Sequence, residues 1–372
     1  MPGYLGRFLD SLAERCKVVT CFLHLADVDE LQQMDYTIQS DNIYWVNLGV
    51  RGSVPRRLIF AKKITELISE YQRDFDYLLI RGPTPLLPAV ARAAGDLPTA
   101  LLLVGDYVAG IDDLPQPDWR KEAIRLWARW NKYQQMRVAQ GSLTFVNSHK
   151  LYEELRSIVP NVVETRTTTL TAADFYERAD TCQKPPYHLL YTGRLERGKG
   201  LADMVEALAL LVGGGYDACL DIVGWPQPGD QVLDEIMAQA SELGLEERVV
   251  YHGFKPLGEE LFTYYKKADI FIIASRSSEG FPRTVWEAMA HSLPVVATRV
   301  GSIPAFIEGS AILVSPGNPQ ELAGGIQHLI EHAEQRRELI QRGINLARQN
   351  TLDAQADQMV REMEHWLEER QR

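Results

Sequence analysis

Two glutamates stand eight positions apart in the segment EGFPRTVWE, which occupies residues 279–287. The run before it, ADIFIIAS at 268–275, is short, apolar and β-branched, which is typical of a strand buried in a parallel sheet. Glu279 is therefore expected at the carboxyl edge of that strand, and Glu287 on the helix that should follow. Carboxylates placed there can accept hydrogen bonds from sugar hydroxyl groups; for either glutamate alone, a surface charge is the alternative.

The residues between the two glutamates favour a turn into a helix whose first amide groups are free. Gly280 allows a sharp turn, and Pro282 suits the first helical position because its φ is fixed and it lacks an N–H group. The backbone N–H groups of Arg283 and Thr284 would then point out of the helix N-terminus, where a phosphate can bind. Glu287 follows Arg283 by four residues and so shares its helix face.

A second group of candidates lies in GRLERGKG, residues 193–200. Arg194 and Lys199 follow a predicted strand and precede a helix predicted from about Leu201, so both cations lie where a ligand at a strand edge would bind. A guanidinium and an ammonium beside helix amides can hold a diphosphate without a metal ion. A solvated basic turn is the alternative for this motif taken alone.

Glycines end three of the predicted strands in the second half of the chain: Gly193, Gly224 and Gly253. In open α/β sheets ligands bind beyond the carboxyl ends of the strands, where glycine permits close approach. Many strands end in a glycine that binds no ligand, but three such glycines at one edge of a sheet favour a ligand site.

Such a site requires parallel sheets. Apolar strand-like runs alternate with amphipathic helical stretches along the chain, which predicts an α/β fold. The expected strands are KVVTCFLHL, IYWVNL, YLLIRG, TALLLVG and LTFVNS in the first half, and HLLYTG, ACLDIVG, RVVYHG, IFIIAS, LPVVAT and AILV in the second. A polar segment ending in Pro185 and Pro186 separates the two sets, so a domain boundary is predicted near 175–186.

The composition is that of a globular protein large enough for two domains. The chain has 372 residues, of which 45% are hydrophobic and 24% are charged. Its formal net charge of −11 argues against general nucleic-acid binding. Nearly all of the acidity lies in the second half, since residues 1–150 carry a net charge of +1 and residues 151–372 carry −12.

The cysteines favour a reducing compartment. Cys16, Cys21, Cys182 and Cys219 form no CxxC pair and have no histidine cluster beside them, so the sequence predicts neither a zinc site nor a disulfide framework. The first residues contain no apolar signal core, and no run approaches the roughly 20 apolar residues of a membrane span. We expect a cytoplasmic protein, either soluble or peripheral on the inner face of the membrane.

The segment 118–137, DWRKEAIRLWARWNKYQQMR, predicts a basic amphipathic helix with a net charge of +4. At 100° per residue its apolar stripe holds Trp119, Ala123, Leu126, Trp127, Trp130 and Tyr133, and the opposite face holds Lys121, Arg125, Arg129 and Lys132. A basic helix rich in tryptophan can lie on an anionic membrane. The alternative is the usual one for an amphipathic helix, in which the apolar stripe packs in the core and the basic face is solvated.

Together these motifs resemble those of the retaining glycosyltransferases of family four, the glycosyl transferases group one. The resemblance extends over about residues 188–330, through GRLERGKG, DIVG, VVYHGF, SEGFPRTVWEAMA, LPVVATRVGSIP and AILVSPGN. It implies the GT-B fold, an α/β fold with two Rossmann-like domains facing across a cleft. The implied parts are an acceptor-binding domain at 1–175, a nucleotide-sugar-binding domain at 186–345 and a C-terminal helix at 346–372 that packs back on the first domain.

The resemblance also implies roles for the candidate residues. Arg194 and Lys199 would bind the donor diphosphate, Glu279 would contact the transferred sugar, and Glu287 would bind the ribose. The nucleotide base is expected near the loop after Gly253. The donor-binding residues that we expect are Gly6, Gly193, Gly224, Phe254, Gly280, Phe281, Pro282, Arg283, Thr284 and Glu287.

The first half of the chain departs from the family pattern in two places. Gly3 and Gly6 are similar to the glycine loop that in the family approaches the diphosphate and the acceptor, but no strand pattern precedes them. The histidine that many relatives carry near the reacting centre has no counterpart in LLLVGDYVAG, where Asp106 is the nearest polar candidate. Asp106 is expected either to position the acceptor hydroxyl as part of the catalytic set or to cap the next turn.

The predicted cations Arg194 and Lys199 bear on whether the enzyme needs a metal ion. Asp112 and Asp113 could be taken for the carboxylate pair of a metal-dependent transferase, but we expect a polar loop there, because Arg194 and Lys199 already neutralise the leaving group. The prediction is therefore an enzyme without metal or cofactor.

The predicted function is a retaining hexosyltransferase. Its donor would be a UDP-sugar or GDP-sugar, and its acceptor a hydroxyl group of a glycan or lipid-linked molecule in surface polysaccharide or glycolipid assembly. The alternatives are a non-catalytic partner subunit of the same fold, and a nucleotide-sugar epimerase or hydrolase.

Overall fold

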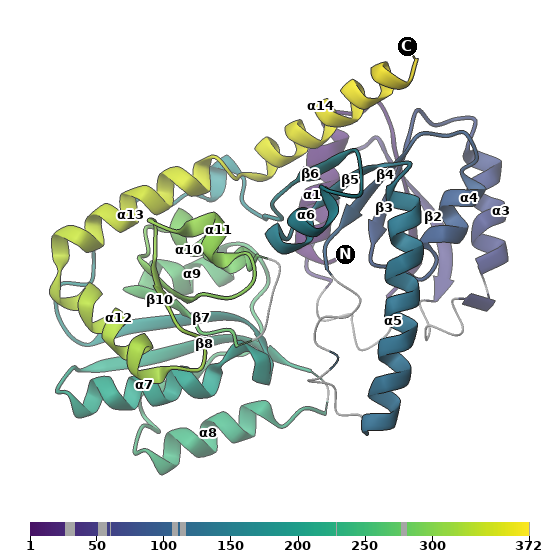
Figure 1. Cartoon of the computed structure of the whole chain (residues 1–372). Helices are drawn as coiled ribbons and strands as arrows, with labels where there is room; N and C mark the ends of the chain where they lie inside the picture. Colours follow the sequence, from purple (N-terminus) through teal and green to yellow (C-terminus); the bar gives the residue numbers. More distant parts are fainter. Residues whose placement is uncertain are drawn as a thin grey trace. The chain divides into compact units, whose positions relative to one another are not determined.

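The chain forms two compact α/β units (Figure 1). This computed structural model describes residues 1–26, 34–50, 58–59, 61–105, 111, 117–227, 229–276 and 281–371. One unit comprises Met1–Thr167 together with Leu352–Arg372, and the other comprises Thr168–Thr351. All named strand pairings in both units are parallel, which confirms the α/β fold predicted from the alternating pattern.

The first unit contains two parallel sheets. One pairs β1 (Val19–Leu25) with β2 (Ile43–Val50), and the other has the order β3 (Leu78–Gly82), β4 (Thr99–Leu103), β5 (Leu143–Val146) and β6 (Val162–Glu164). Its helices are α1 (Gly3–Ala13), α3 (Ala61–Tyr71), α4 (Leu87–Ala93), α5 (Asp118–Ala139), α6 (His149–Leu155) and α14 (Leu352–Gln371). The sequence predicted every strand here except β6, which is too short to show a pattern.

Helix α14 packs on the four-stranded sheet of the first unit. Its side chains Met359, Met363 and Trp366 join buried residues of β4 and β5 in one apolar cluster. The side chain of Thr165 donates a hydrogen bond of 2.9 Å to Gln355 of α14. The last segment of the chain therefore contributes to the core of the unit that the first segment begins.

The second unit is built on one six-stranded sheet with the order β12-β11-β10-β7-β8-β9. The strands are β7 (Tyr187–Leu195), β8 (Ala218–Pro226), β9 (Val249–Tyr251), β10 (Ile270–Ile273), β11 (Val295–Thr298) and β12 (Ile312–Val314), all of them predicted from the sequence. The helices are η2 (Ala172–Asp174), η3 (Arg197–Lys199), α7 (Leu201–Gly213), α8 (Val232–Glu242), α9 (Glu259–Lys267), α10 (Arg283–Ala290), α11 (Ile303–Ile307), α12 (Pro319–Glu331) and α13 (Ala333–Arg348).

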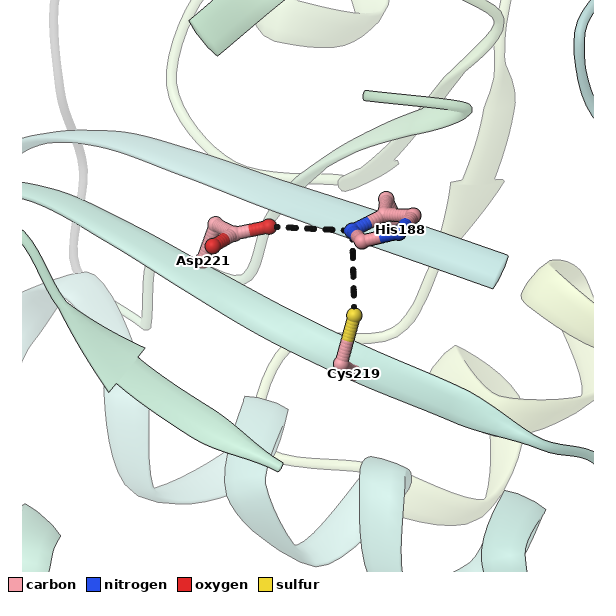
Figure 2. Close-up of side chains that lie close together, drawn as sticks. All are labelled: His188, Cys219 and Asp221. Carbon is pink, nitrogen blue, oxygen red and sulfur yellow. Dashed lines mark hydrogen bonds and ion pairs between the residues drawn. The ribbon is translucent and has the colours of Figure 1, made fainter. Parts of the chain in front are cut away.

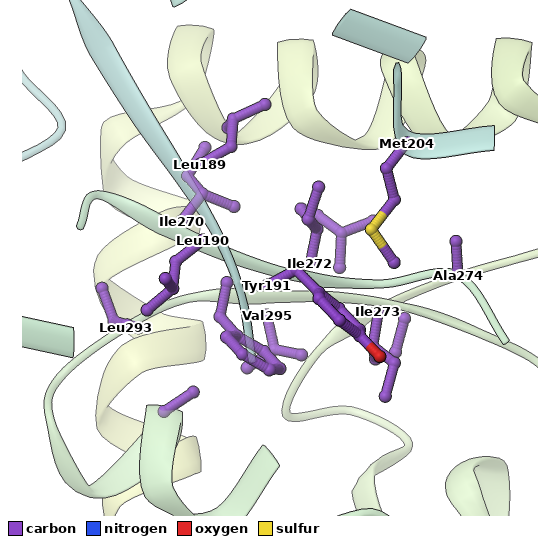
Figure 3. Close-up of a cluster of buried hydrophobic side chains, with 14 of the residues drawn as sticks. Leu189, Leu190, Tyr191, Met204, Ile270, Ile272, Ile273, Ala274, Leu293 and Val295 are labelled. Carbon is purple, nitrogen blue, oxygen red and sulfur yellow. The ribbon is translucent and has the colours of Figure 1, made fainter. Parts of the chain in front are cut away.

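The central strands of this sheet, β7 and β10, are buried on both faces, as parallel strands covered by helices must be. Figure 3 shows their side chains packed together with Met204 of α7 and Val295 of β11. All four residues of β10 are buried. The candidate residues at the ends of these strands thus stand on a close-packed support.

The segment predicted as a linker, 175–186, is instead packed on the second unit. Asp180 forms a buried ion pair with Arg336 of α13, with 2.6 Å between Oδ2 and Nη2. Thr181 donates a hydrogen bond of 2.6 Å to Asp269. The polar side chains that suggest a linker in the sequence are therefore partners of buried groups, and the boundary between the units precedes Thr168.

The predicted glycine loop at the start of the chain is a helix. Residues Gly3–Ala13 form α1, and Gly6 is buried against the ring of Tyr36, where an added Cβ atom would lie 2.1 Å from Cδ1. Gly6 is thus required for the packing of α1 on Tyr36. Its predicted role in donor binding receives no support from this position.

Helix α5 turns its aromatic stripe outward. Trp119 is 69% exposed and Trp130 is 61% exposed, while the buried face carries Ala128, Asn131 and Gln135. The alternative in which the stripe packs in the core is therefore wrong. Small and amide side chains allow that face of the helix to approach the rest of the unit, and the tryptophans remain at the surface.

Candidate active site

Three glycines meet at the carboxyl edge of β7, β8 and β9. Gly193 pairs with Gly224 in the parallel register, and both have positive φ, 147° and 153°. A Cβ atom on Gly224 would lie 1.7 Å from the carbonyl oxygen of Gly193, so no side chain fits there. The amide of Gly224 donates a hydrogen bond of 3.0 Å to the carbonyl of Gly253. The structure thus brings together the three glycines that the sequence singled out.

The last residues of β7 and the turn after this strand hold the two predicted cations, Arg194 and Lys199. Arg194 is about half exposed, at 49%, and its Nη1 lies 2.6 Å from Oε1 of Glu196. Lys199 is half-buried at the end of η3. Gly200 follows with a φ of 69°, and a Cβ atom there would lie 1.9 Å from the carbonyl oxygen of Ala274, at the end of β10. This close approach places the cation-bearing turn against the loop that follows β10.

A further contact, which the sequence analysis did not predict, holds these two loops together. Arg276, just after β10, donates through Nε to Oδ2 of Asp203 at 2.7 Å and contacts the other carboxylate oxygen through Nη2. The backbone amide of Arg276 also donates to the carbonyl of Gly198 at 2.8 Å. The Asp203 side chain is buried in the first turn of α7. Arg276 is therefore a positioning residue for the turn that carries Lys199.

Several predicted residues lie outside the described part of the chain. These are Asp106, Glu279 and Gly280 among the site candidates, and Asp112 and Asp113 among the residues considered for a metal. Their predicted roles stay predictions.

Glu287 is buried, with 4% of its surface exposed. Its Oε1 accepts a hydrogen bond of 2.7 Å from the hydroxyl of Thr169, and its Oε2 accepts one of 2.7 Å from the hydroxyl of Tyr265. Two hydroxyl donors offset the cost of burying this carboxylate. Its predicted contact with a ribose stays a prediction, and the structure adds a role in joining α10 to α9 and to the segment before η2.

Tyr265 extends this network to β7. Its hydroxyl also lies 2.6 Å from Oγ1 of Thr192, the residue before Gly193. Burial and the adjacent Glu287 carboxylate raise the pKa of Tyr265 well above its usual value, so the phenol is neutral and donates to the carboxylate. The network therefore connects the helix after β10 with β7, at the residue before the paired glycine of this strand.

His291 packs beside the same network. Its Nδ1 lies 2.7 Å from the carbonyl oxygen of Glu287, and its ring stacks on that of Tyr265 with centroids 5.3 Å apart. Burial lowers the pKa of His291. The imidazole is thus neutral near pH 7 and donates from Nδ1 to the carbonyl.

Replacing Tyr265 with phenylalanine should lower the free energy of unfolding by about 1.5 kcal/mol, because a buried charged acceptor loses one of its two donors. Urea unfolding followed by circular dichroism measures this change. Tyr264→Phe is the matched control, since the contacts of Tyr264 with His252 and Lys255 are made by its ring. Equal stability of the two variants would contradict the role assigned to the Tyr265 hydroxyl.

Helix α10 begins one residue later than predicted. Pro282 has extended backbone and is the residue before the helix, so Arg283 and Thr284 are the first two helical residues. Their amides are among those that the first turn of a helix leaves without intrahelical acceptors. The predicted helix N-terminus is therefore present, with Pro282 outside it, and phosphate binding there stays a prediction.

The two aromatic residues predicted to bind the donor, Phe281 and Phe254, differ in burial. Phe281 is buried and packs on the rings of Trp286 and Phe306, with centroids 4.4 Å and 5.3 Å away, so it supports the start of α10 from the core. Phe254 is half-buried and meets the Trp225 ring edge-on at 5.2 Å, at the end of β8. Trp225, which sequence reasoning missed, directly follows Gly224 and provides a second ring beside the glycine edge.

The part of the chain that carries this site matches a known family. Residues 175–346 match the family model described as glycosyl transferases group 1, in agreement with the resemblance to that group found in the motifs. Over 173 residues the chain is 31% identical to the D-inositol 3-phosphate glycosyltransferase of Corynebacterium glutamicum, a match that covers 45% of this chain and 41% of that protein. It is 35% identical over 145 residues to the amylovoran biosynthesis glycosyltransferase AmsK of Erwinia amylovora, with 37% and 34% covered. The match thus spans less than half the length of these curated relatives.

Solved structures extend the likeness to the whole chain at the level of the fold. The structure of Anabaena HepE in complex with UDP and glucose aligns with a TM-score of 0.74 at 19% identity, covering 98% of this chain and 96% of that one. Sucrose-phosphate synthase from Thermosynechococcus elongatus aligns with a TM-score of 0.75 at 21% identity, covering 96% and 91%. The fold is that of the GT-B glycosyltransferases, as the motifs implied.

Proposed function

We infer that the chain belongs to the glycosyl transferases group 1, and we propose that it is a retaining hexosyltransferase. Its donor would be a hexose linked to a nucleoside diphosphate, and its acceptor a hydroxyl group of a glycan or lipid-linked molecule. The observation that carries this proposal is the glycine edge of β7 and β8, with Arg194 directly after Gly193 on β7 and Lys199 on the turn that follows the strand.

The edge suits a diphosphate for steric and electrostatic reasons. Backbone without side chains at Gly193 and Gly224 lets a ligand approach closely. Arg194 near the end of β7, Lys199 on the following turn and the first amides of α10 supply positive charge and hydrogen-bond donors. Such groups stabilise a diphosphate most when it leaves, because its negative charge then increases.

The proposed reaction breaks the bond between the anomeric carbon and the diphosphate oxygen, and the electron pair leaves with the diphosphate. The acceptor oxygen bonds to the anomeric carbon from the same face, and the hydroxyl proton passes to the departing phosphate. Retention of configuration follows from this front-face attack. The part assigned to this chain is to hold the leaving group through Arg194 and Lys199.

The donor nucleotide is proposed to be UDP or GDP. The similarity in fold to a protein solved with UDP and glucose supports trying UDP-glucose first. Incubating the purified protein with UDP-hexoses and GDP-hexoses and measuring slow donor hydrolysis tests the proposal. Binding of a nucleoside diphosphate without any turnover would favour the alternative of a non-catalytic partner subunit.

Donor hydrolysis should persist when EDTA is present. The cations of the β7 turn and the α10 N-terminus already offset the diphosphate charge, so no divalent ion is required there. Activity measured with EDTA, and again after adding Mg²⁺ or Mn²⁺ in excess, checks this expectation. Full loss with EDTA and recovery with either ion would give Asp112 and Asp113 the metal-binding role considered in the sequence analysis.

The acceptor is proposed to belong to surface polysaccharide or glycolipid assembly. One relative of this chain is an amylovoran biosynthesis glycosyltransferase. No helix in the described ranges is long and apolar enough to cross a membrane. The exposed aromatic stripe of α5 and its basic flanks suit attachment to an anionic membrane surface, where a lipid-linked acceptor would be found.

A further inference from the structure

Three side chains that offer metal-ligand atoms lie together on the second unit (Figure 2). His188 is on β7, and Cys219 and Asp221 are on β8. The parallel register pairs His188 with Cys219, and Asp221, two residues along β8, points to the same face of the sheet. Their ligand atoms all lie within 4.8 Å of one another.

The contacts converge on one atom. The Nδ1 atom of His188 lies 3.1 Å from Sγ of Cys219 and 3.4 Å from Oδ2 of Asp221, as the two dashed lines in Figure 2 show. A relay of cysteine, histidine and aspartate would use both ring nitrogens, one for each partner. Convergence on a single nitrogen instead fits three ligands around one cation.

The spacing also fits zinc. Bonds of about 2.0–2.3 Å in a tetrahedral zinc site place neighbouring ligand atoms about 3.3–3.8 Å apart. The two distances from Nδ1 of His188, 3.1 Å to Sγ of Cys219 and 3.4 Å to Oδ2 of Asp221, are close to that range. Small side-chain adjustments would therefore be enough to admit the ion.

A second histidine orients the carboxylate. Nε2 of His252, just after β9, lies 2.6 Å from Oδ1 of Asp221, which leaves Oδ2 directed at His188. Such outer partners fix the orientation of ligands and raise metal affinity. His252 thus has the position of a supporting residue beside the three ligands.

We propose that His188, Cys219 and Asp221 bind a Zn²⁺ ion that links β7 to β8. Thiolate and imidazole ligands favour zinc over Mg²⁺ or Ca²⁺, and three protein ligands leave a fourth position for water. The His188 side chain is 43% exposed, so an ion can enter from solvent. His188 precedes Gly193 by five residues on β7, or about 16 Å of strand, so the ion would lie far from the proposed diphosphate.

Co²⁺ titration of the full-length protein, freed of metal by chelation, tests this site. We expect one Co²⁺ per chain, with the strong visible absorption of a tetrahedral site and a thiolate-to-cobalt charge-transfer band in the near ultraviolet. Cys219→Ser should remove the charge-transfer band, and His188→Gln should weaken binding at least tenfold. Cys16→Ser is the matched control, because Cys16 is a half-buried thiol that contacts the Tyr77 hydroxyl, and it should change neither band.

Two further measurements separate this site from other histidines and from misfolding. His252→Gln should keep the stoichiometry and weaken binding about 10–100-fold, as loss of an outer partner does. His328→Gln combined with His332→Gln, which removes the stacked histidine pair at the C-terminal end of α12, should leave the spectrum unchanged. In the wild-type protein, Zn²⁺ should protect Cys219 from alkylation by iodoacetamide, as read by mass spectrometry.

The proposal is overturned if wild-type protein binds Co²⁺ without a thiolate band, or if Zn²⁺ gives Cys219 no protection. Equal Co²⁺ binding by Cys219→Ser and wild type would overturn it as well.

Discussion

Lys199→Ala is expected to lower kcat/KM for the donor by at least 10²-fold, about 2.7 kcal/mol of transition-state stabilisation. The ammonium lies on the turn that follows the glycine edge, where the leaving diphosphate is proposed to gain charge. An interaction that strengthens as charge develops lowers kcat as well as kcat/KM. Steady-state kinetics of donor hydrolysis measures both.

Arg197→Ala is the matched control for Lys199→Ala. Arg197 stands on the same turn, but its guanidinium is paired with Asp230 at 3.0 Å and with Glu235 of α8 at 2.5 Å. Its charge is therefore already paired with two carboxylates, and its loss should change kcat/KM less than threefold, as for a surface pair worth well under 1 kcal/mol. If a folded Lys199→Ala protein turned over the donor as fast as Arg197→Ala, Lys199 would not be the residue that stabilises the leaving diphosphate.

The strands of this protein could be predicted because each carries a continuous apolar run. Segments such as IFIIAS and LPVVAT are buried on both faces of a parallel sheet, so burial leaves a clear pattern in the sequence. The glycine edge followed from the same pattern, since strand ends in a parallel sheet are neighbours. Strand β6 was missed because Val162–Glu164 is three residues long.

Pairings between distant residues could not be predicted. Arg276 and Asp203 are 73 positions apart, and His188 and Cys219 are 31 apart, so no local spacing indicates that they meet. The strand register brings His188 to Cys219, and the packing of the residues after β10 on the start of α7 brings Arg276 to Asp203. The polar segment before Pro185 misled for a similar reason, because the buried partner of Asp180 is on α13.

The sequence also could not predict which face of α5 is exposed to solvent. An apolar stripe at helical spacing usually packs in the core. In α5 the buried face is instead formed by Ala128, Ala139 and the amides Asn131 and Gln135, which helical periodicity does not distinguish from solvated residues. Tertiary contacts decided which face is buried, and they left the tryptophans outside.

The exposed aromatic stripe of α5 leads to the second prediction, which concerns binding to anionic membranes. Trp119, Leu126, Trp130 and Tyr133 are all more than half exposed on α5. By helical geometry Arg137 lies in line with them, while Arg120 and Arg129 flank the stripe on its two sides. An amphipathic helix of this kind places its rings at the headgroup level and its arginines against anionic lipid phosphates.

Changing Arg120, Arg129 and Arg137 to glutamate should lower partition onto anionic vesicles by on the order of 10²-fold, because each lost arginine removes about 1 kcal/mol of attraction. Sedimentation with phosphatidylserine-containing vesicles at low salt measures the partition. Arg337, Arg342 and Arg348, which are exposed on α13, changed to glutamate give a control with the same change in net charge on the acidic second unit. That control should sediment like wild type, and both triple variants should keep donor hydrolysis. If wild type does not sediment with these vesicles, or if the two triple variants lose binding equally, the stripe of α5 is not a membrane-binding surface and the acceptor is better sought among soluble glycans.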